Sequence, residues 1–190
     1  MDYLLALLQG LGIAAAIGIR PFLPVLLVAA LAGADLGVDF EGTEFAFLEQ
    51  TGFLLAILFG VVALGIVERR AAERVGIVLL VISVVLGALL AAGSLDDVSP
   101  TWWPGLIVGA PAAALGWAAA RSLFGRVRAR LDKAAASAVP LYAEGSALLA
   151  AGLSVLFPPL AVLIVAGLAW LLLGSRRRSG EKYAGLRILR

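Results

Sequence analysis

Long apolar stretches without charged residues follow one another along almost the whole chain. Residues 3–34 contain a single charge, Arg20, and the 31 residues between Glu144 and Arg176 contain none. About 20 apolar residues in a helix are enough to cross the ~30 Å hydrocarbon core of a bilayer. Hydrophobic residues make up 62% of the 190 residues and charged residues 15%, against roughly 45–50% and 25% in soluble domains. The chain is therefore predicted to be an integral membrane protein with one transmembrane domain, 1–190.

Charges and prolines divide this domain into about six predicted transmembrane helices, so the expected fold class is an all-α, polytopic membrane protein. The first span is longer than one crossing needs, and Pro21 and Pro24 remove backbone donors inside it. We expect one discontinuous helix there, Tyr3–Ile19 followed by Phe22–Ala32. The other expected spans are Phe45–Val67, Val75–Gly93, Trp102–Ala120, Ser137–Phe157 and Leu160–Leu173. The last two form a hairpin, 137–174; one long kinked helix there would give five spans instead.

The distribution of basic residues favours six spans over five. With six spans and a cytoplasmic N-terminus, 14 of the 15 Lys and Arg residues fall on the cytoplasmic side, including those of a basic tail, 176–190. The loops on the other side hold only acidic charges, between Asp35 and Glu44 and at Asp96 and Asp97. Because positive charge accumulates in cytoplasmic loops, we expect a multi-pass protein of the cytoplasmic membrane with both termini cytoplasmic.

Two parts of the chain, 1–95 and 101–175, show weak internal similarity. A run of Gly and Ala precedes both Arg20 and Arg121. Two inverted three-helix repeats, with broken helices where they meet, are a common plan of transporters. The alternative is a chance match between segments rich in small residues, whose ordinary use is to let helix backbones approach closely.

Charged residues inside predicted spans are the candidate functional residues. An ionisable side chain inside the bilayer costs at least ~2.5 kcal/mol and therefore needs a partner, a cavity or a function. Arg20 lies at the helix break beside Pro21 and Pro24, where freed backbone groups can line a cavity. Its guanidinium offers a planar set of donors that suits carboxylate or phosphate, so we predict an anion contact. The alternatives are an ion pair with Glu49 and snorkelling of Arg20 to the outer headgroups.

A second pair of charges, Arg121 and Glu144, lies near the inner ends of two predicted spans. In a repeat, Arg20–Glu49 and Arg121–Glu144 would be equivalent pairs on opposite sides of the membrane. Such pairs act either as alternating gates, with a carboxyl group that can carry a proton, or as static braces. Tyr142 is close to Glu144 in sequence and is a candidate hydrogen-bond donor to it.

The chain contains no cysteine and no histidine. This excludes thiol nucleophiles, disulfides, Cys/His metal sites and imidazole acid–base chemistry. We therefore expect no metal site and no cofactor. An intramembrane enzyme, the third hypothesis, would have to use carboxylates or Ser and Lys. Because serines are sparse and neither Lys133 nor Lys182 lies in a predicted span, we expect no enzymatic activity. The basic residues, among them Arg126, Arg128 and Arg130, lie beside membrane spans, which argues against a nucleic-acid partner. They suit topology anchoring and anionic lipid headgroups at the cytoplasmic face.

The segment Gly18-Ile19-Arg20-Pro21-Phe22-Leu23-Pro24 resembles the opening motif of the domain-of-unknown-function 4126 family of bacterial membrane proteins. The Leu-rich sequence from Glu144 to Pro158 is also similar to that family, and the resemblance covers residues 8–70 and 105–170. It implies a polytopic protein of the bacterial inner membrane with no settled activity. The chain departs from the family at Gly145, where the resemblance implies a second acidic residue, so a paired-carboxylate role is not expected there.

Two functional hypotheses follow from these residues. The first is a small transporter or permease, expected to be a homo-oligomer, for a small anion or a phosphorylated lipid. In it Arg20 contacts the anion, while Glu49 and Glu144 act as gates or proton-coupling groups. The second is a structural or partner-binding membrane protein without transport, in which the Arg and Glu pairs only brace the helix bundle.

Overall fold

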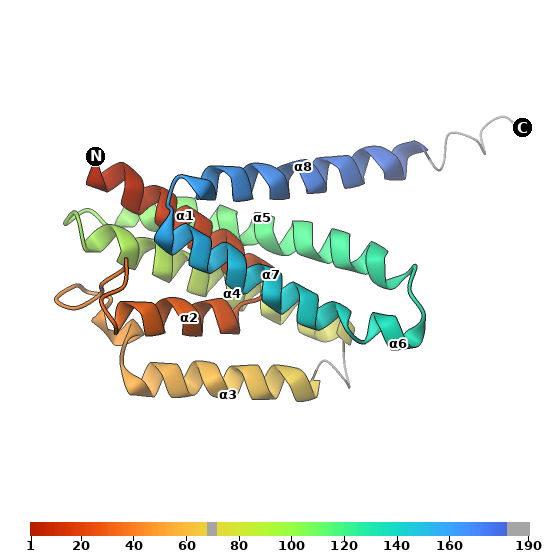
Figure 1. Ribbon diagram of the computed structural model, residues 1–190, viewed down its shortest axis with the longest axis horizontal. Helices are drawn as coiled ribbons and strands as arrows, with labels where there is room; N and C mark the ends of the chain where they lie inside the picture. Colours follow the sequence, from red (N-terminus) through yellow and green to blue (C-terminus); the bar gives the residue numbers. More distant parts are fainter. Residues whose placement is uncertain (68–71, 182–190) are drawn as a thin grey trace, which may run out of the picture.

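In the computed structural model, all regular secondary structure of the described residues, 1–67 and 72–181, is helical (Figure 1). The helices are α1 (Asp2–Ile19), α2 (Phe22–Ala32), the short 3-10 helix η1 (Ala46–Leu48), α3 (Thr51–Val67), α4 (Ala72–Asp96), α5 (Trp103–Arg128), α6 (Lys133–Ala136), α7 (Val139–Leu156) and α8 (Leu160–Glu181). The expected all-α class is confirmed for this part of the chain. The basic charges predicted within 68–71 and 182–190 lie outside the described residues.

Four of these helices are long and apolar enough to cross a membrane. They are α1, the Gly76–Asp96 part of α4, α5 and α7, and three shorter apolar segments lie in α2, α3 and α8. Their outer faces expose large apolar side chains such as Phe59, Ile77 and Trp170, each at least 70% exposed. Exposed apolar area of this extent needs an apolar surrounding. The helix set supports a helical membrane protein, although not a count of exactly six spans.

The chain reverses direction at Arg20 and Pro21, between α1 and α2. Gln9, halfway along α1, donates a 2.5 Å hydrogen bond from Nε2 to the carbonyl oxygen of Gly37, which lies beyond the end of α2. These residues are 28 apart in sequence, and a continuous helix would separate them by roughly 42 Å. α2 therefore runs back toward the start of α1 (Figure 1). The break occurs where it was predicted, but the prediction of one discontinuous span was wrong, because the two pieces form a hairpin.

Small residues bring α1 into close contact with α4 and α5. Gly10 of α1 faces the backbone of Ala91 in α4, and Gly116 of α5 faces the backbone of Ala15 in α1. A Cβ added at either glycine would overlap backbone atoms of the facing helix. The runs of Gly and Ala therefore serve close helix packing, as in other membrane bundles.

α1 and α5, on which the predicted repeat depends, run in the same direction (Figure 1). Near one end, Gly10 and Gly105 both pack on Ala91; further along both helices, Gly18 of α1 packs on Ala113 of α5. An inverted repeat would require these two helices to be antiparallel. The prediction of two inverted repeats was therefore wrong for the helices that suggested it.

The chain also reverses between α7 and α8, where Pro158 and Pro159 lie in the turn. Gly12 of α1 packs against both Ser154 of α7 and Ala161 of α8, so the two helices meet α1 at the same level. The prediction of two helices rather than one long kinked helix is confirmed. Because α8 continues through Glu181, the first part of the predicted tail is helical.

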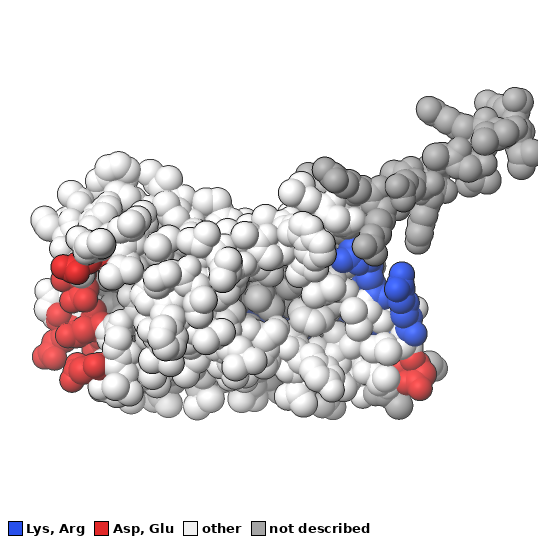
Figure 2. Space-filling model, turned by 45° about the horizontal axis from the view of Figure 1, so that its top comes forward, with Lys and Arg blue, Asp and Glu red and all other residues white. Residues whose placement is uncertain are grey.

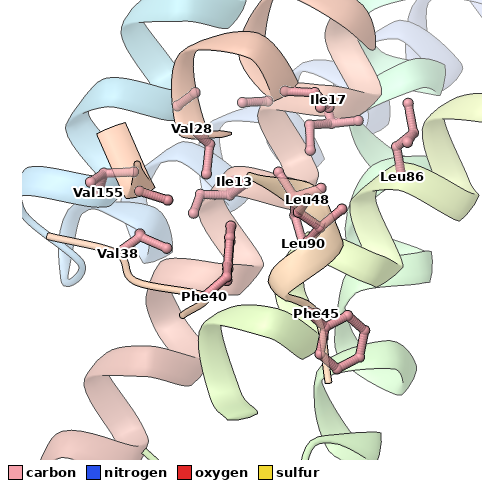
Figure 3. Close-up of a cluster of buried hydrophobic side chains, with 14 of the residues drawn as sticks. Ile13, Ile17, Val28, Val38, Phe40, Phe45, Leu48, Leu86, Leu90 and Val155 are labelled. Atoms are coloured by element: carbon pink, nitrogen blue, oxygen red, sulfur yellow. The ribbon is translucent and has the colours of Figure 1, made fainter. Parts of the chain in front are cut away.

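The segment between α2 and α3 seals one end of the bundle. Phe40 and Leu48 are fully buried, and Figure 3 shows them close to side chains of α1 and α4 such as Ile13. The predicted span 45–67 starts later in the structure, because η1 and the turn after it precede α3, which begins at Thr51. A segment predicted as a polar loop and a helix start thus contributes large side chains to the core.

Acidic side chains gather at one end of the bundle, and basic side chains with a smaller acidic patch gather at the other (Figure 2). The acidic end is the sealed end, where the backbone N–H of Glu44 donates to Oδ2 of Asp96, which ends α4, at 2.9 Å. The basic end comprises the C-terminal part of α5 with Arg121, Arg126 and Arg128. α1 begins at the acidic end and α8 ends at the basic end (Figure 1). In a bundle that crossed a membrane along this axis, the start of α1 and the end of α8 would lie on opposite sides, because the α1–α2 hairpin adds a reversal. The cytoplasmic position of both termini stays a prediction.

Candidate functional site

Arg20 forms an ion pair with Glu144 inside the bundle. Arg20 follows α1 directly, and Glu144 lies in the second turn of α7, which runs antiparallel to α1. The Nε–Oε1 distance is 3.5 Å, and the side chains are 13% and 24% exposed. The C-terminal end of the α1 dipole is negative and also favours a cation at this position. Arg20 and Glu144, which were predicted to belong to two different pairs, therefore form one ion pair with each other.

Glu49 lies at the acidic end, away from Arg20. Its Oε1 accepts a 2.6 Å hydrogen bond from the backbone N–H of Phe40, so it fastens the loop that seals this end. The predicted Arg20–Glu49 pair was wrong, because it assumed that Glu49 lies inside a span. The structure instead places Glu49 directly after η1 and before α3.

Arg121 lies against α4 and its own helix. Its guanidinium carbon is 5.2 Å from the ring centroid of Trp117, within the range of a cation–π contact. A Cβ added to Gly76 of α4 would overlap this guanidinium, so the glycine makes room for it. The predicted Arg121–Glu144 pair was also wrong, because Glu144 forms an ion pair with Arg20 and the guanidinium of Arg121 lies against Trp117 and Gly76.

A pocket of about 780 Å³ lies between the α1–α2 turn and the basic-end parts of α4, α5 and α7. Arg20, Arg121 and Arg128 line it, and none of the Asp and Glu residues whose side chains the structure describes does. Its wall follows α5 from Trp117 to Arg128, roughly 16 Å along the helix axis. The other lining residues are mostly apolar, among them Ile19, Leu79, Trp117, Phe124 and Val139, and two serines, Ser83 and Ser137, also line the pocket. The pocket thus joins a basic wall to an apolar one.

Ser83 of α4 lines the same pocket and is fully buried. Within the described ranges, its hydroxyl has no hydrogen-bond partner. Two other buried serines, Ser94 and Ser154, donate to the carbonyl oxygens of Leu90 and Ala150 in their own helices, which is the usual arrangement for a helical serine. Ser83 therefore keeps a donor and an acceptor that the surrounding protein does not use.

Pro21, Pro24 and Tyr142 occupy different kinds of position. Pro21 precedes α2 and lines the pocket, and Pro24 lies in the first turn of α2, where a missing N–H costs no helical hydrogen bond. Tyr142 is 72% exposed on α7. Residues two apart on a helix do not face each other, so its position does not support the predicted hydrogen bond to Glu144.

The sequence alone did not identify Ser83, Arg128 or Gly76 as parts of this site. A usable signal exists for Ser83, which is the single polar side chain in the predicted span Val75–Gly93. Arg128 was predicted only as a headgroup or topology charge. Nothing in the sequence shows that Arg128 lines a pocket while Arg126 does not, because this depends on how α5 packs.

The described residues contain no group of three or more His, Cys, Asp or Glu side chains that could hold a metal ion. One carboxyl group outside the spans, that of Asp97 at the acidic end, has a pKa above its ordinary value of 3.8. Burial is the main cause, and the negative charge of Asp39 adds to it. The acidic end therefore holds like charges in mutual repulsion.

Comparisons of the chain with protein-family models, with curated proteins and with solved structures find no significant match in any of the three. The resemblance to the domain-of-unknown-function 4126 family therefore stays a prediction. The function has to be argued from the pocket and its side chains.

Proposed function

We propose that the chain is a small membrane transporter or permease for a small anion or a phosphorylated lipid, with Arg20 as the anion contact. The observation that carries this proposal is the pocket, which reaches the α1–α2 turn and is lined by Arg20, Arg121 and Arg128. Basic side chains around a low-dielectric cavity concentrate anions inside it. An arginine that only held helices together would not need a cavity of about 780 Å³ beside it.

The proposed location is a bacterial cytoplasmic membrane with the basic end at the cytoplasmic face, following the positive-inside rule. The pocket then lies on the cytoplasmic side, where anionic headgroups can contact the arginines of α5. The end of α8 would be cytoplasmic and the start of α1 external. Assembly into a homo-oligomer stays a prediction.

Glu144 is the proposed gate. Its carboxylate and an incoming anion compete for the guanidinium of Arg20, because both accept hydrogen bonds from the same N–H donors. Anion binding would free Glu144 from Arg20 and loosen the contact between the α1–α2 turn and α7. Glu49 has no part in this proposal, since it lies at the acidic end and fastens the loop there.

The test combines thermal unfolding in detergent with anion flux into proteoliposomes, using inorganic anions, carboxylates and lipid phosphates. A ligand that binds only the native state raises the melting temperature. We expect stabilisation and flux for the wild type and for the control Arg126→Gln, an exposed arginine of α5 that does not line the pocket. Arg20→Gln should lose both. Absence of any anion response in the wild type would refute the proposal.

The alternative, a bracing role without transport, is favoured by the Arg20–Glu144 ion pair itself. It predicts that exchanging the two charges, in Arg20→Glu/Glu144→Arg, restores the stability lost in Arg20→Gln. Under the bracing hypothesis no anion stabilises any variant. Under the transporter hypothesis the exchanged protein is stable but has lost the wild-type anion response, because its guanidinium has moved to α7.

A further inference from the structure

We infer that the ligand of this pocket is a phosphomonoester that carries an organic group, rather than a bare inorganic anion. This inference rests on the proposed function, because it concerns the same pocket. Three independent properties of the site support it: its volume, its charge balance and the hydroxyl of Ser83.

The volume of the pocket exceeds the needs of an inorganic oxyanion. Pockets of about 300–1,000 Å³ enclose organic ligands of drug size, and this pocket measures about 780 Å³. A water molecule takes about 30 Å³ in the liquid, and a tetrahedral oxyanion is only a few times larger. A bare anion would leave the apolar wall of Leu79, Phe124 and Val139 without contacts, whereas an organic group would cover it.

The charge balance of the described side chains favours a doubly charged headgroup. Arg20, Arg121 and Arg128 line the pocket, and the carboxylate of Glu144 offsets one of their three charges through its ion pair. Arginine charge therefore exceeds carboxylate charge among the pocket side chains that the structure describes. A phosphomonoester carries about −1.5 to −2 at pH 7, which matches this excess. A carboxylate or a phosphodiester carries about one negative charge and would be attracted less strongly by these arginines.

Ser83 supplies a hydrogen bond that a phosphate oxygen can accept. Buried hydroxyls are as a rule hydrogen-bonded, and the described protein offers no partner to this one. Arg121 packs over Gly76, and Ser83 lies two turns further along α4. Ser83 is therefore deeper in the pocket than Arg121, on the side of the α1–α2 turn that carries Arg20. A phosphate held there meets donors from three different elements.

The arginines of α5 suggest how such a headgroup enters. Arg121 and Arg128 are two helical turns apart on α5, roughly 10 Å along its axis. A headgroup between Arg20 and Arg121 therefore leaves Arg128 at the mouth of the pocket, near the basic end. Arg128 would attract the anion on its way in and would contribute less to the bound state than Arg20.

The experiment compares four probes at constant ionic strength by thermal unfolding of the purified protein in detergent. The probes are dihexanoyl phosphatidic acid, dihexanoyl phosphatidylglycerol, phenyl phosphate and inorganic phosphate. We expect at least one monoester to half-saturate the wild type at a concentration about tenfold below that of the diester and of inorganic phosphate. The lower value among the two monoesters identifies the source, a lipid for phosphatidic acid and a soluble metabolite for phenyl phosphate.

Two pairs of matched variants test the assignment of residues. Ser83→Ala should weaken monoester binding several-fold without lowering stability in the absence of ligand, because its hydroxyl has no partner to lose among the described residues. The control is Ser94→Ala, another buried serine of α4, which should leave binding unchanged. Arg128→Gln should weaken binding, and more so at low salt, whereas Arg126→Gln should not.

The outcomes separate this inference from the proposed function. Equal binding of monoester and diester, an equal effect of inorganic phosphate, or an equal response of Ser83→Ala and Ser94→Ala would overturn the inference alone. Failure of every anion to stabilise the wild type would overturn the proposed function with it.

Discussion

The same helices are packed closely at one end of the bundle and enclose a pocket at the other end. At the acidic end, glycine and alanine bring α1, α4 and α5 into backbone contact, and the loop with Phe40 and Leu48 fills the remaining space. At the basic end, arginine and aromatic side chains of α5 surround a pocket of about 780 Å³. The comparison shows that a change in side-chain size along one helix can produce a closely packed core at one end of a bundle and a pocket at the other.

The largest effect is expected where the backbones touch. Gly116→Ala would place a Cβ against the carbonyl of Ala15, so α1 and α5 would have to separate. Overpacking of this kind costs about 3 kcal/mol, and we expect a clear drop in melting temperature. Gly125→Ala, on the same helix with nothing within 4 Å of the added atom, is the control. Equal stability of the two variants would break the contrast between the closely packed and the open part of α5.

A smaller loss is expected from the Arg20–Glu144 ion pair beside the pocket. Arg20→Gln removes the ion pair with Glu144 and should cost about 2 kcal/mol, less than loss of a fully buried pair because both side chains are partly exposed. Glu144→Gln should cost a similar amount. In a double-mutant cycle followed by thermal unfolding, the double variant should lose less stability than the sum of the single ones. Additive losses would show that the two charges do not interact.

At the acidic end, the loop hydrogen bond of Glu49 should be worth about 1 kcal/mol. Glu49→Ala removes the acceptor for the N–H of Phe40, whereas Glu49→Gln keeps a carbonyl oxygen and should lose less. Both variants should keep the anion response of the wild type, because the pocket lies at the other end. Loss of the anion response in Glu49→Gln would show that the acidic end is coupled to the pocket and that the charge of the Glu49 carboxylate contributes to this coupling.

The smallest effect is a pH dependence at Asp97. Its pKa is raised in the folded protein by burial and by Asp39, so the folded state holds this proton more tightly than the unfolded state. Ionisation above the ordinary pKa of 3.8 therefore reduces stability. Asp97→Asn should raise the melting temperature slightly at pH 7 and leave it unchanged below pH 3.8. Asp35→Asn in the nearby loop is the control, and destabilisation by Asp97→Asn at pH 7 would contradict the assignment.

The features that depend on neighbouring residues in the sequence, namely apolar stretches and helix ends, were predicted correctly. The apolar stretches indicated a membrane protein, and the prolines after Arg20 and after Phe157 marked the two places where helices end. The direction of the chain after the first break was not accessible in this way. No Lys or Arg precedes Arg20, so an additional reversal there leaves the count of basic charges on each side unchanged. The positive-inside rule therefore could not detect the α1–α2 hairpin.

The sequence identified individual charged residues of the candidate site, but not which of them form an ion pair. Arg20 and Glu144 stood out because each is a charge within an apolar stretch. Their contact depends on α7 running antiparallel to α1, a tertiary arrangement that sequence spacing does not encode. Glu49 stood out for the same reason as Glu144, yet the local fold of η1 places it in a loop. A single charge in an apolar stretch therefore indicated that the residue has a structural or functional role, but did not indicate which residue it contacts.

The positions of the start of α1 and the end of α8 have a consequence for joining copies of the protein. α1 begins at the acidic end and α8 ends at the basic end. If the basic end faces the cytoplasm as proposed, a second copy attached behind the first by a short polar linker would start on the opposite side of the bilayer and insert in the inverted orientation. A covalent dimer with both pockets facing the same compartment needs an extra crossing in the linker, of about 20 apolar residues. Gene fusion with and without such a helix would thus select parallel or antiparallel dimers.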